Sequence, residues 1–294
     1  MKITITGSLG NISKPLAQNL LAAGHNVTVI SSNPKRKTDI EVLGAKAAIG
    51  DIADVDFLIN AFKGADAIYT MVPPNWTVDN YRQYIAATGA AYREAIKASG
   101  VKHVVNLSSI GAHLANGTGP IAGLYDVEQA LNGLDSVNIK HLRAGIFLTN
   151  YFFDIALIRN MGIMGNNYSS HSQLVMVHPR DIAAAAAQEI QTLFEGKSHR
   201  YVVGVESDPA SAARILGAEI GKPGLAWVEF SDADTLAGMT AAGMSAAIAN
   251  LYVEMGRAIN NKILFEDFNL NRPNVLGKIK LSDFAHEFAT VYQS

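Results

Sequence analysis

The sequence predicts an α/β fold in which a doubly wound parallel sheet carries a smaller, mostly helical C-terminal subdomain. In the first half of the chain, short β-branched runs alternate with longer helical patterns, which is typical of βαβ units. These runs are apolar throughout, as expected for strands that helices cover on both faces. The predicted strands are Lys2–Thr6, Asn26–Ile30, Ala45–Ile49, Ala67–Met71, His103–Leu107 and Ile139–Leu142.

The segments between these strands have the spacing of helices. The predicted helices are Lys14–Ala23, Val55–Phe62, Asp79–Ser99 and Tyr125–Gly133. Three of them are followed by a glycine, at the position where a left-handed residue commonly ends a helix: Gly24, Gly64 and Gly100. This repeated order of helix, glycine and strand supports a Rossmann-type sheet.

Composition excludes several other classes of protein. Of the 294 residues 49% are hydrophobic and 17% charged, a globular balance, and the net charge of −2 without a Lys or Arg block argues against nucleic acid. The absence of cysteine excludes disulfides and thiolate sites, and the eight histidines lack metal-ligand spacing, so no metal is expected. No apolar run approaches the roughly 20 residues of a membrane span. The N-terminus reads as a strand rather than a secretory signal, so we expect a soluble, cytoplasmic protein that binds no membrane.

A glycine-rich turn, Thr6-Gly7-Ser8-Leu9-Gly10-Asn11-Ile12-Ser13, joins the first strand to the first helix. Gly7 and Gly10 allow the backbone to turn tightly and approach a pyrophosphate, whose charge the helix N-terminus meets. The spacing places the small Ser13 where many dinucleotide-binding turns have a third glycine for close helix–strand packing. An ordinary glycine turn is the alternative, but the position in an N-terminal βαβ unit favours a dinucleotide site. The predicted contacts are Gly7, Ser8, Leu9, Gly10, Asn11 and Ile12.

The second half of the chain is less regular. We predict a strand at Leu174–Val177, an alanine-rich helix with Asp181 as its N-cap, and further strands at Tyr201–Val205 and Ala226–Phe230. Residues 1–150 are therefore expected to form the dinucleotide-binding core, with residues 173–205 returning to its sheet. Residues 151–172 and 206–294 are expected to form a smaller substrate-side subdomain.

Several short motifs follow the predicted strands in a characteristic order. They are the Thr-Gly-x-x-Gly-Asn-Ile turn, Gly50-Asp51, Val72-Pro73-Pro74, Leu107-Ser108-Ser109-Ile110-Gly111-Ala112, Leu142-Arg143-Ala144-Gly145-Ile146-Phe147 and Asp181-Ile182-Ala183. In this order and spacing the chain resembles the NmrA-like group of atypical short-chain dehydrogenases/reductases over nearly its whole length. The resemblance implies an NAD(P)-binding Rossmann fold and a quinone oxidoreductase-like activity.

The resemblance also implies cofactor contacts beyond the glycine turn. Asp51 and Ile52 match the contacts to the adenine edge, although Asp51 is also suited to cap a helix. Val72 and the two prolines match a wall near the ribose, with a rigid loop exit as the alternative. In addition to Val72 and Pro73, the resemblance implies cofactor contacts at the strand ends from Met71, Ser108 and Gly145.

The residues after the second strand select the cofactor. A carboxylate there would bind the ribose 2′-hydroxyl of NAD, but the sequence reads Ser31-Ser32-Asn33-Pro34-Lys35-Arg36-Lys37. No negative charge repels a 2′-phosphate, and the basic residues attract one; a solvated helix start is the alternative. We therefore expect Ser32, Asn33 and Arg36 to contact the cofactor, with NADP(H) favoured over NAD(H).

The candidate catalytic residue is Tyr125, within Tyr125-Asp126-Val127-Glu128-Gln129. Short-chain dehydrogenases use Tyr-x-x-x-Lys, in which the lysine lowers the tyrosine pKa. Gln129 carries no charge, so ordinary alcohol–ketone dehydrogenation is disfavoured, and a half-buried structural aromatic is the preferred alternative for Tyr125.

The acceptor is expected to be a small conjugated molecule. Hydride transfer to a quinone-like compound needs orientation and a dry pocket more than a strong protein acid. The predicted substrate contacts are Pro74, Phe147, Asn150 and Tyr151, while Phe152 and Phe153 are expected to pack between the subdomains. The alternative function is a catalytically silent NAD(P)-binding redox sensor that acts on a partner protein. A homo-oligomer is left open.

Overall fold

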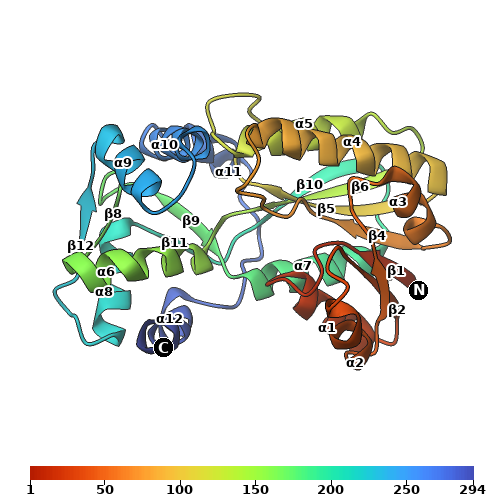
Figure 1. Cartoon of the computed structure of the whole chain (residues 1–294), viewed down its shortest axis with the longest axis horizontal. Coiled ribbons are helices and arrows are strands. Elements are labelled where there is room, and N and C mark those ends of the chain that lie inside the picture. Colours follow the sequence, from red (N-terminus) through yellow and green to blue (C-terminus); the bar gives the residue numbers. More distant parts are fainter.

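The computed structural model describes residues 1–294, and its central element is a seven-stranded parallel sheet (Figure 1). The strand order is β10-β6-β5-β4-β1-β2-β3, and every neighbouring pair is parallel. The strands are β1 Lys2–Ile5, β2 Asn26–Ser31, β3 Lys46–Ile49, β4 Ala67–Thr70, β5 His103–Ser109, β6 Asn138–Ala144 and β10 Lys197–Val202. The order reverses between β1 and β4, and open α/β sheets commonly bind their ligands at the carboxyl ends of the strands at such a reversal. The predicted doubly wound Rossmann-type sheet is confirmed.

Helices cover both faces of this sheet, as Figure 1 shows. One face carries α1 Ser13–Ala22, α2 Arg36–Val42 and α7 Pro179–Thr192; the other carries α3 Val55–Phe62, α4 Tyr81–Ser99 and α5 Ile121–Asn132. Successive residues of a strand point to opposite faces, so Val105 and Leu142 pack beneath α7, while Val104 and Ile139 pack beneath α4 and α5.

The predicted helix ends are confirmed at the glycines. Gly24, Gly64 and Gly100 all have positive φ, and Gly100 is itself the C-cap of α4, with φ +78°. At its other end α4 is capped by Asn80, whose side chain accepts a hydrogen bond from the Gln83 amide. None of the helices combines the length and the apolar character that crossing a membrane requires.

The rest of the chain forms the left-hand part of Figure 1. It contains a three-stranded sheet of order β11-β9-β7 and a two-stranded sheet of β12 and β8. Its strands are β7 Ile146–Phe147, β8 Ile163–Asn166, β9 Leu174–Val177, β11 Val205–Ser207 and β12 Ala226–Glu229. Its helices are η1 Leu148–Asp154, α6 Ile155–Met161, α8 Pro209–Glu219, α9 Asp232–Ala241, α10 Ala246–Asn260, η2 Ile263–Phe265, α11 Glu266–Leu270 and α12 Leu281–Gln293. The predicted strand Leu174–Val177 is thus present, and it lies in the three-stranded sheet.

The two phenylalanines of η1 behave differently. Phe152 packs on Phe284 and Phe288, with ring centroids 5.4 and 6.1 Å apart, so it is a packing residue as predicted, but within the smaller subdomain and not between the two. The same prediction is wrong for Phe153, whose side chain is 81% exposed. Neighbouring residues of a 3₁₀ helix point about 120° apart, so both rings cannot face one core.

The predicted N-cap of the alanine-rich helix is also wrong. Helix α7 begins at Pro179, and its N-cap is His178, whose ring nitrogen accepts a hydrogen bond from the Arg180 amide. Proline is favoured at the first helical position, which moves the start ahead of Asp181. The Asp181 carboxylate instead accepts hydrogen bonds from the amides of Lys278 and Ile279, at 3.1 and 3.0 Å. It thereby ties the segment between α11 and α12 to the sheet-covering helix.

Candidate functional site at the carboxyl edge of the sheet

The turn after β1 has a backbone that only glycine fits at position 7. Gly7 has φ +89°, and a Cβ there would lie 2.5 Å from Ser13 Oγ and 3.0 Å from Met71 Sδ. Ser8 also adopts positive φ, and its amide donates to the Ile30 carbonyl at 3.0 Å. The Gly10 amide closes the turn on the Gly7 carbonyl at 3.1 Å. The turn is therefore narrow and joined to both β1 and β2.

Helix α1 begins at this turn without a side-chain cap. Its N-cap, Ile12, makes no side-chain hydrogen bond, and the Ser13 amide has no acceptor in the chain, whereas the Lys14 amide donates to the Gly10 carbonyl at 3.0 Å. Ser13 is buried, and its hydroxyl donates to the Thr6 carbonyl at 2.8 Å, which draws the helix onto the strand as expected for the third small residue. We call the narrow turn from Gly7 to Ser13 the Gly7 cradle. Together with the start of α1, which has no side-chain cap, it fits a pyrophosphate.

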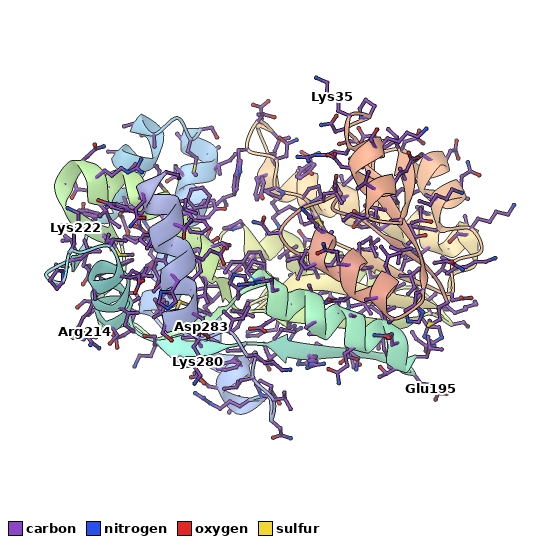
Figure 2. The ribbon with its side chains drawn as sticks, turned by 90° about the horizontal axis from the view of Figure 1, so that it is seen from below. Lys35, Glu195, Arg214, Lys222, Lys280 and Asp283 are labelled. Carbon is purple, nitrogen blue, oxygen red and sulfur yellow. The ribbon has the colours of Figure 1, made fainter.

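The end of β2 brings polar groups to the same turn. Ser8 Oγ donates to Ser31 Oγ at 2.9 Å, and Ser31 Oγ accepts from the Asn33 amide at 3.2 Å. Ser32, Asn33 and Arg36 are exposed, and Arg36 forms an ion pair with Asp39 at 3.3 Å. Lys35 projects into solvent at the rim of the molecule (Figure 2).

The loop after β4 is held by hydrogen bonds to Thr6 and to helix α4. The Met71 amide donates to Thr6 Oγ1 at 2.9 Å, while two tyrosines of α4 donate to the loop carbonyls: Tyr92 to Met71 at 2.7 Å and Tyr84 to Pro73 at 2.9 Å. Three predicted cofactor residues, Met71, Val72 and Pro73, are thus held close to Gly7 by a rigid base.

The adenine-side pair lies after β3. Asp51 is exposed and accepts from the Ala53 amide at 2.9 Å, while Ile52 packs against the core of α3 and α4. The alternative that Asp51 caps the following helix is wrong, because the N-cap of α3 is Asp54, which accepts from the Phe57 amide at 3.0 Å. The Asp51 carboxylate therefore keeps an oxygen free at the surface.

Two other predicted cofactor residues have structural partners. The Ser108 hydroxyl is buried and donates to Glu128 Oε1 at 2.6 Å. A Cβ on Gly145 would lie 2.6 Å from the Val175 carbonyl oxygen, so the absence of a side chain lets β9 approach. A buried hydrogen bond therefore explains the serine at position 108, and close packing explains the glycine at position 145.

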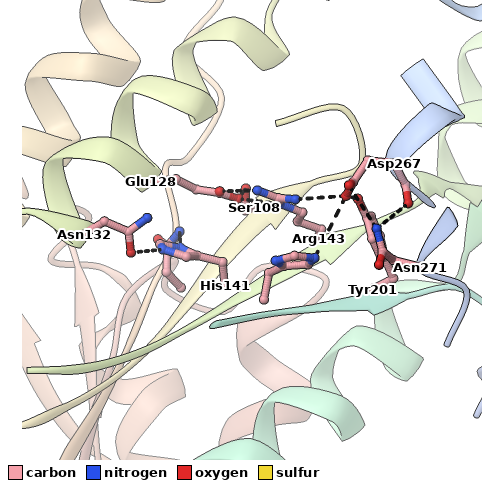
Figure 3. Close-up of polar contacts among 10 residues, drawn as sticks. Ser108, Glu128, Asn132, His141, Arg143, Tyr201, Asp267 and Asn271 are labelled. Atoms are coloured by element: carbon pink, nitrogen blue, oxygen red, sulfur yellow. Dashed lines mark hydrogen bonds and ion pairs between the residues drawn. The ribbon is translucent and has the colours of Figure 1, made fainter. Parts of the chain in front are cut away.

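Sequence reasoning missed a buried ion-pair network under α5, drawn in Figure 3. Arg143 Nη2 lies 2.7 Å from Glu128 Oε2, and its Nε donates to Glu128 Oε1 at 3.1 Å. On its other side, Arg143 Nη1 lies 3.3 Å from Asp267 of α11, which also accepts from the Tyr201 hydroxyl. The available signal was an arginine within a strand that helices cover on both faces, where apolar residues are the rule.

A second polar row crosses the same face of the sheet. Thr70 Oγ1 donates to Asn106 Oδ1 at 2.9 Å, and Asn106 Nδ2 contacts His141 Nδ1 at 3.1 Å. His141 Nε2 then contacts Asn132 Oδ1 at 3.1 Å. Because Asn106 offers its amide nitrogen and Asn132 its oxygen, the hydrogen bonds select a neutral imidazole with the proton on Nε2.

Protonation of His141 is expected to make stability depend on pH. Burial lowers the pKa of His141 from 6.5 to about 4. As pH falls below 6.5, the unfolded chain therefore takes up a proton that the folded chain refuses, and the free energy of unfolding falls by up to about 3 kcal/mol before levelling off below pH 4. Urea unfolding between pH 7 and pH 4 measures this. The His141→Gln variant should lose that part of the slope, and an unchanged slope would contradict the assignment.

Tyr125 lies on α5, three residues before Glu128 of the network. Its ring is half-buried and its hydroxyl makes no hydrogen bond to another residue, in keeping with the absence of a lysine at Gln129. The neighbouring Asp126 is paired with Arg82 of α4 at 2.7 Å, and Glu128 with Arg143. Helix α5 is therefore anchored on both sides of the tyrosine.

The predicted acceptor residues are spread over different environments. Pro74 and Asn150 are exposed, and Phe147 is half-buried against the core beneath α7. Tyr151 is buried, with its hydroxyl donating to Met176 Sδ at 3.4 Å, and burial raises its pKa well above the usual value. Tyr151 is therefore a core residue whose ring is not available at the surface.

The cradle, the uncapped helix and the reversal in strand order are features of Rossmann-type dinucleotide-binding folds. Residues 7–140 match the model of a family described as NAD(P)H-binding. This match covers less than half of the chain and, with the structural neighbours, agrees with the NAD(P)-binding Rossmann fold that the resemblance implies.

Individual relatives agree in fold. The structure is similar to the NADPH-dependent quinone oxidoreductase of Escherichia coli complexed with NADPH, with a TM-score of 0.82 and 20% identity over 97% of this chain and 99% of that one. It is also similar to the triphenylmethane reductase of Citrobacter complexed with NADP(H), with a TM-score of 0.77 and 19% identity over 98% and 99% of the two chains. A Mycobacterium tuberculosis protein classed as an oxidoreductase is 27% identical over 145 residues. That alignment covers 46% of this chain and 63% of the relative, less than two thirds of its length.

Proposed function

We propose that this chain is an NAD(P)H-dependent oxidoreductase that passes hydride to a quinone-like or otherwise conjugated small molecule. The observation that carries the proposal is the combination of a cradle at Gly7 that leaves no space for a Cβ with a tyrosine at position 125 that lacks its lysine. The first feature supplies a dinucleotide site. The second favours an acceptor that needs little help from a protein acid.

The cofactor would be held by the residues that the structure gathers at the carboxyl edge. The turn amides and the start of α1 would bind the pyrophosphate, Asp51 and Ile52 the adenine, and Ser32, Asn33 and Arg36 the ribose 2′-phosphate of NADP(H). Met71, Val72 and Pro73 would form one wall. When bound, the reduced nicotinamide supplies the hydride. Pro74, Phe147 and Asn150 would orient the acceptor, and the proton would come from solvent or from the unpaired hydroxyl of Tyr125.

Arg36 is expected to set the preference for NADP(H). Its ion pair with Asp39 is exposed, with 51% and 57% of the two side chains accessible, so the guanidinium can turn toward a phosphate at little cost. The Arg36→Ala variant should bind NADPH about 5-fold more weakly than the wild type, because an exposed charge contact contributes about 1 kcal/mol. Its affinity for NADH should be unchanged. Calorimetric titration with both cofactors measures the difference, and equal losses for the two would contradict this role.

The activity itself is tested by following NADPH absorbance with a benzoquinone, a naphthoquinone and a triphenylmethane dye. Turnover with at least one acceptor supports the proposal. Tight binding without turnover would favour the redox-sensor alternative, which requires that the oxidised and reduced cofactors bind with different affinities.

A further inference from the structure

An exposed tryptophan joins the loop after β4 to the C-terminal helices. Trp76 is 40% exposed, although one face of its ring stacks on Tyr81 with centroids 5.4 Å apart and planes 12° apart. A second aromatic ring, Tyr252 of α10, lies 5.6 Å from it at 49°. Trp76 and Tyr252 are far apart in the sequence, and their contact connects the cofactor side of the molecule with its C-terminal part.

The loop that carries Trp76 has a fixed base. Met71 and Pro73 are tied to Thr6 and to two tyrosines of α4, as described above. Trp76 is five positions after Met71, so the two Cα atoms lie within roughly 17 Å of each other. The indole is therefore carried by the same loop whose first residue, Met71, lies against Gly7.

Helix α10 also touches the loop that precedes α5. A Cβ on Gly119 would collide with the carbonyl oxygen of Leu251, the residue before Tyr252. Successive residues of α10 thus contact the loops that leave β4 and β5, two adjacent strands at the carboxyl edge. The loop from β5 leads directly into α5 and Tyr125. The aromatic pair therefore lies on the α4 side of the sheet, whereas Phe147 packs on the α7 side.

We infer that Trp76 and Tyr252 form the outer wall of the acceptor pocket and select flat aromatic acceptors by stacking. The inference rests on the proposed function, whose acceptor class it narrows. Tyr151 cannot supply the stacking surface because it is enclosed in the core, whereas Trp76 is a large ring with accessible surface beside the site. Stacking increases with ring area, so acceptors with two or three fused rings should be preferred to those with one.

Tryptophan fluorescence tests the pocket without relying on turnover. The chain has two tryptophans, and Trp227 is buried with its Nε1 donating to the Tyr168 carbonyl. Titrating the NADP⁺-loaded protein, which has no hydride to transfer, with a naphthoquinone should quench the wild-type emission beyond the correction for absorption. The Trp76→Phe variant, which keeps only Trp227, should show less than a third of that quenching. Equal quenching in the two proteins would overturn the inference.

Kinetics provides the second readout. The Trp76→Ala variant should raise KM for a naphthoquinone about 10-fold and for a benzoquinone about 2-fold, with kcat and NADPH affinity unchanged, and Trp76→Phe should recover most of the loss. Phe153→Ala, which removes an exposed ring elsewhere, serves as the matched control. Quenching without turnover would retain the pocket and reject the activity. Turnover with an unaltered KM in Trp76→Ala would reject the pocket and retain the activity.

Discussion

The Gly7→Ala variant is expected to lose about 100-fold in affinity for NADPH, or about 3 kcal/mol. The positive φ of +89° strains any residue with a Cβ, and the added methyl would lie 2.5 Å from Ser13 Oγ. Relief of this clash must move either the turn or the start of α1, and both would contact the pyrophosphate. Calorimetric titration with NADPH measures the loss.

A matched control separates strain from the clash at the site. Gly44 has φ +90° and no atom within 4 Å of an added Cβ, so Gly44→Ala introduces the same backbone strain away from the turn. This variant should bind NADPH like the wild type. If Gly7→Ala also bound like the wild type, with both variants folded by circular dichroism, the turn would have no role in binding the dinucleotide.

The Arg143→Met variant is expected to reduce the free energy of unfolding by about 3–5 kcal/mol. The substitution leaves Glu128 without its cation, and the Glu128 side chain is only 2% exposed. It also removes the bond to Asp267 that joins α11 to the sheet. Urea unfolding at pH 7 measures the change.

Two further variants make this result specific to the buried network. Arg36→Met breaks an exposed ion pair and should cost less than about 0.5 kcal/mol. Adding Glu128→Gln to Arg143→Met removes the unpaired buried charge and should restore part of the loss. A cost below about 1 kcal/mol for Arg143→Met would mean that solvent reaches Glu128 and replaces the arginine.

The parts of the site that are local in sequence could be predicted, and those that depend on distant contacts could not. The Gly7 turn, its Ser13 and the strands around them follow from glycine conformation and apolar alternation over a few residues. The network around Arg143 joins residues 15 and 124 positions away, and no local pattern indicates such partners. The buried position of Tyr151 depends on β9 and α12, which pack around η1 only in the folded chain.

The same reasoning explains two smaller differences. Asp181 has the side chain of a helix cap, but the preceding His178-Pro179 pair starts the helix earlier and leaves the carboxylate to a distant segment. Trp76 carried no signal in the sequence because its partner Tyr252 lies on a helix whose position depends on the whole C-terminal part. Two aromatic residues that are so far apart in the sequence can be assigned to one side of a pocket only when the fold is known.

The most direct test of the central claim is single-turnover hydride transfer from NADPH labelled with deuterium at C4 to a naphthoquinone. The account predicts that NADPH is oxidised in a 1:1 ratio to the hydroquinone formed and that the labelled cofactor reacts more slowly. A 100-fold loss of affinity in the Gly7→Ala variant should reduce the reaction to about a tenth of the wild-type extent at an NADPH concentration ten times the wild-type Kd. Tight NADPH binding with no oxidation of the cofactor by any conjugated acceptor would contradict the account and leave a protein that binds the dinucleotide without using its hydride.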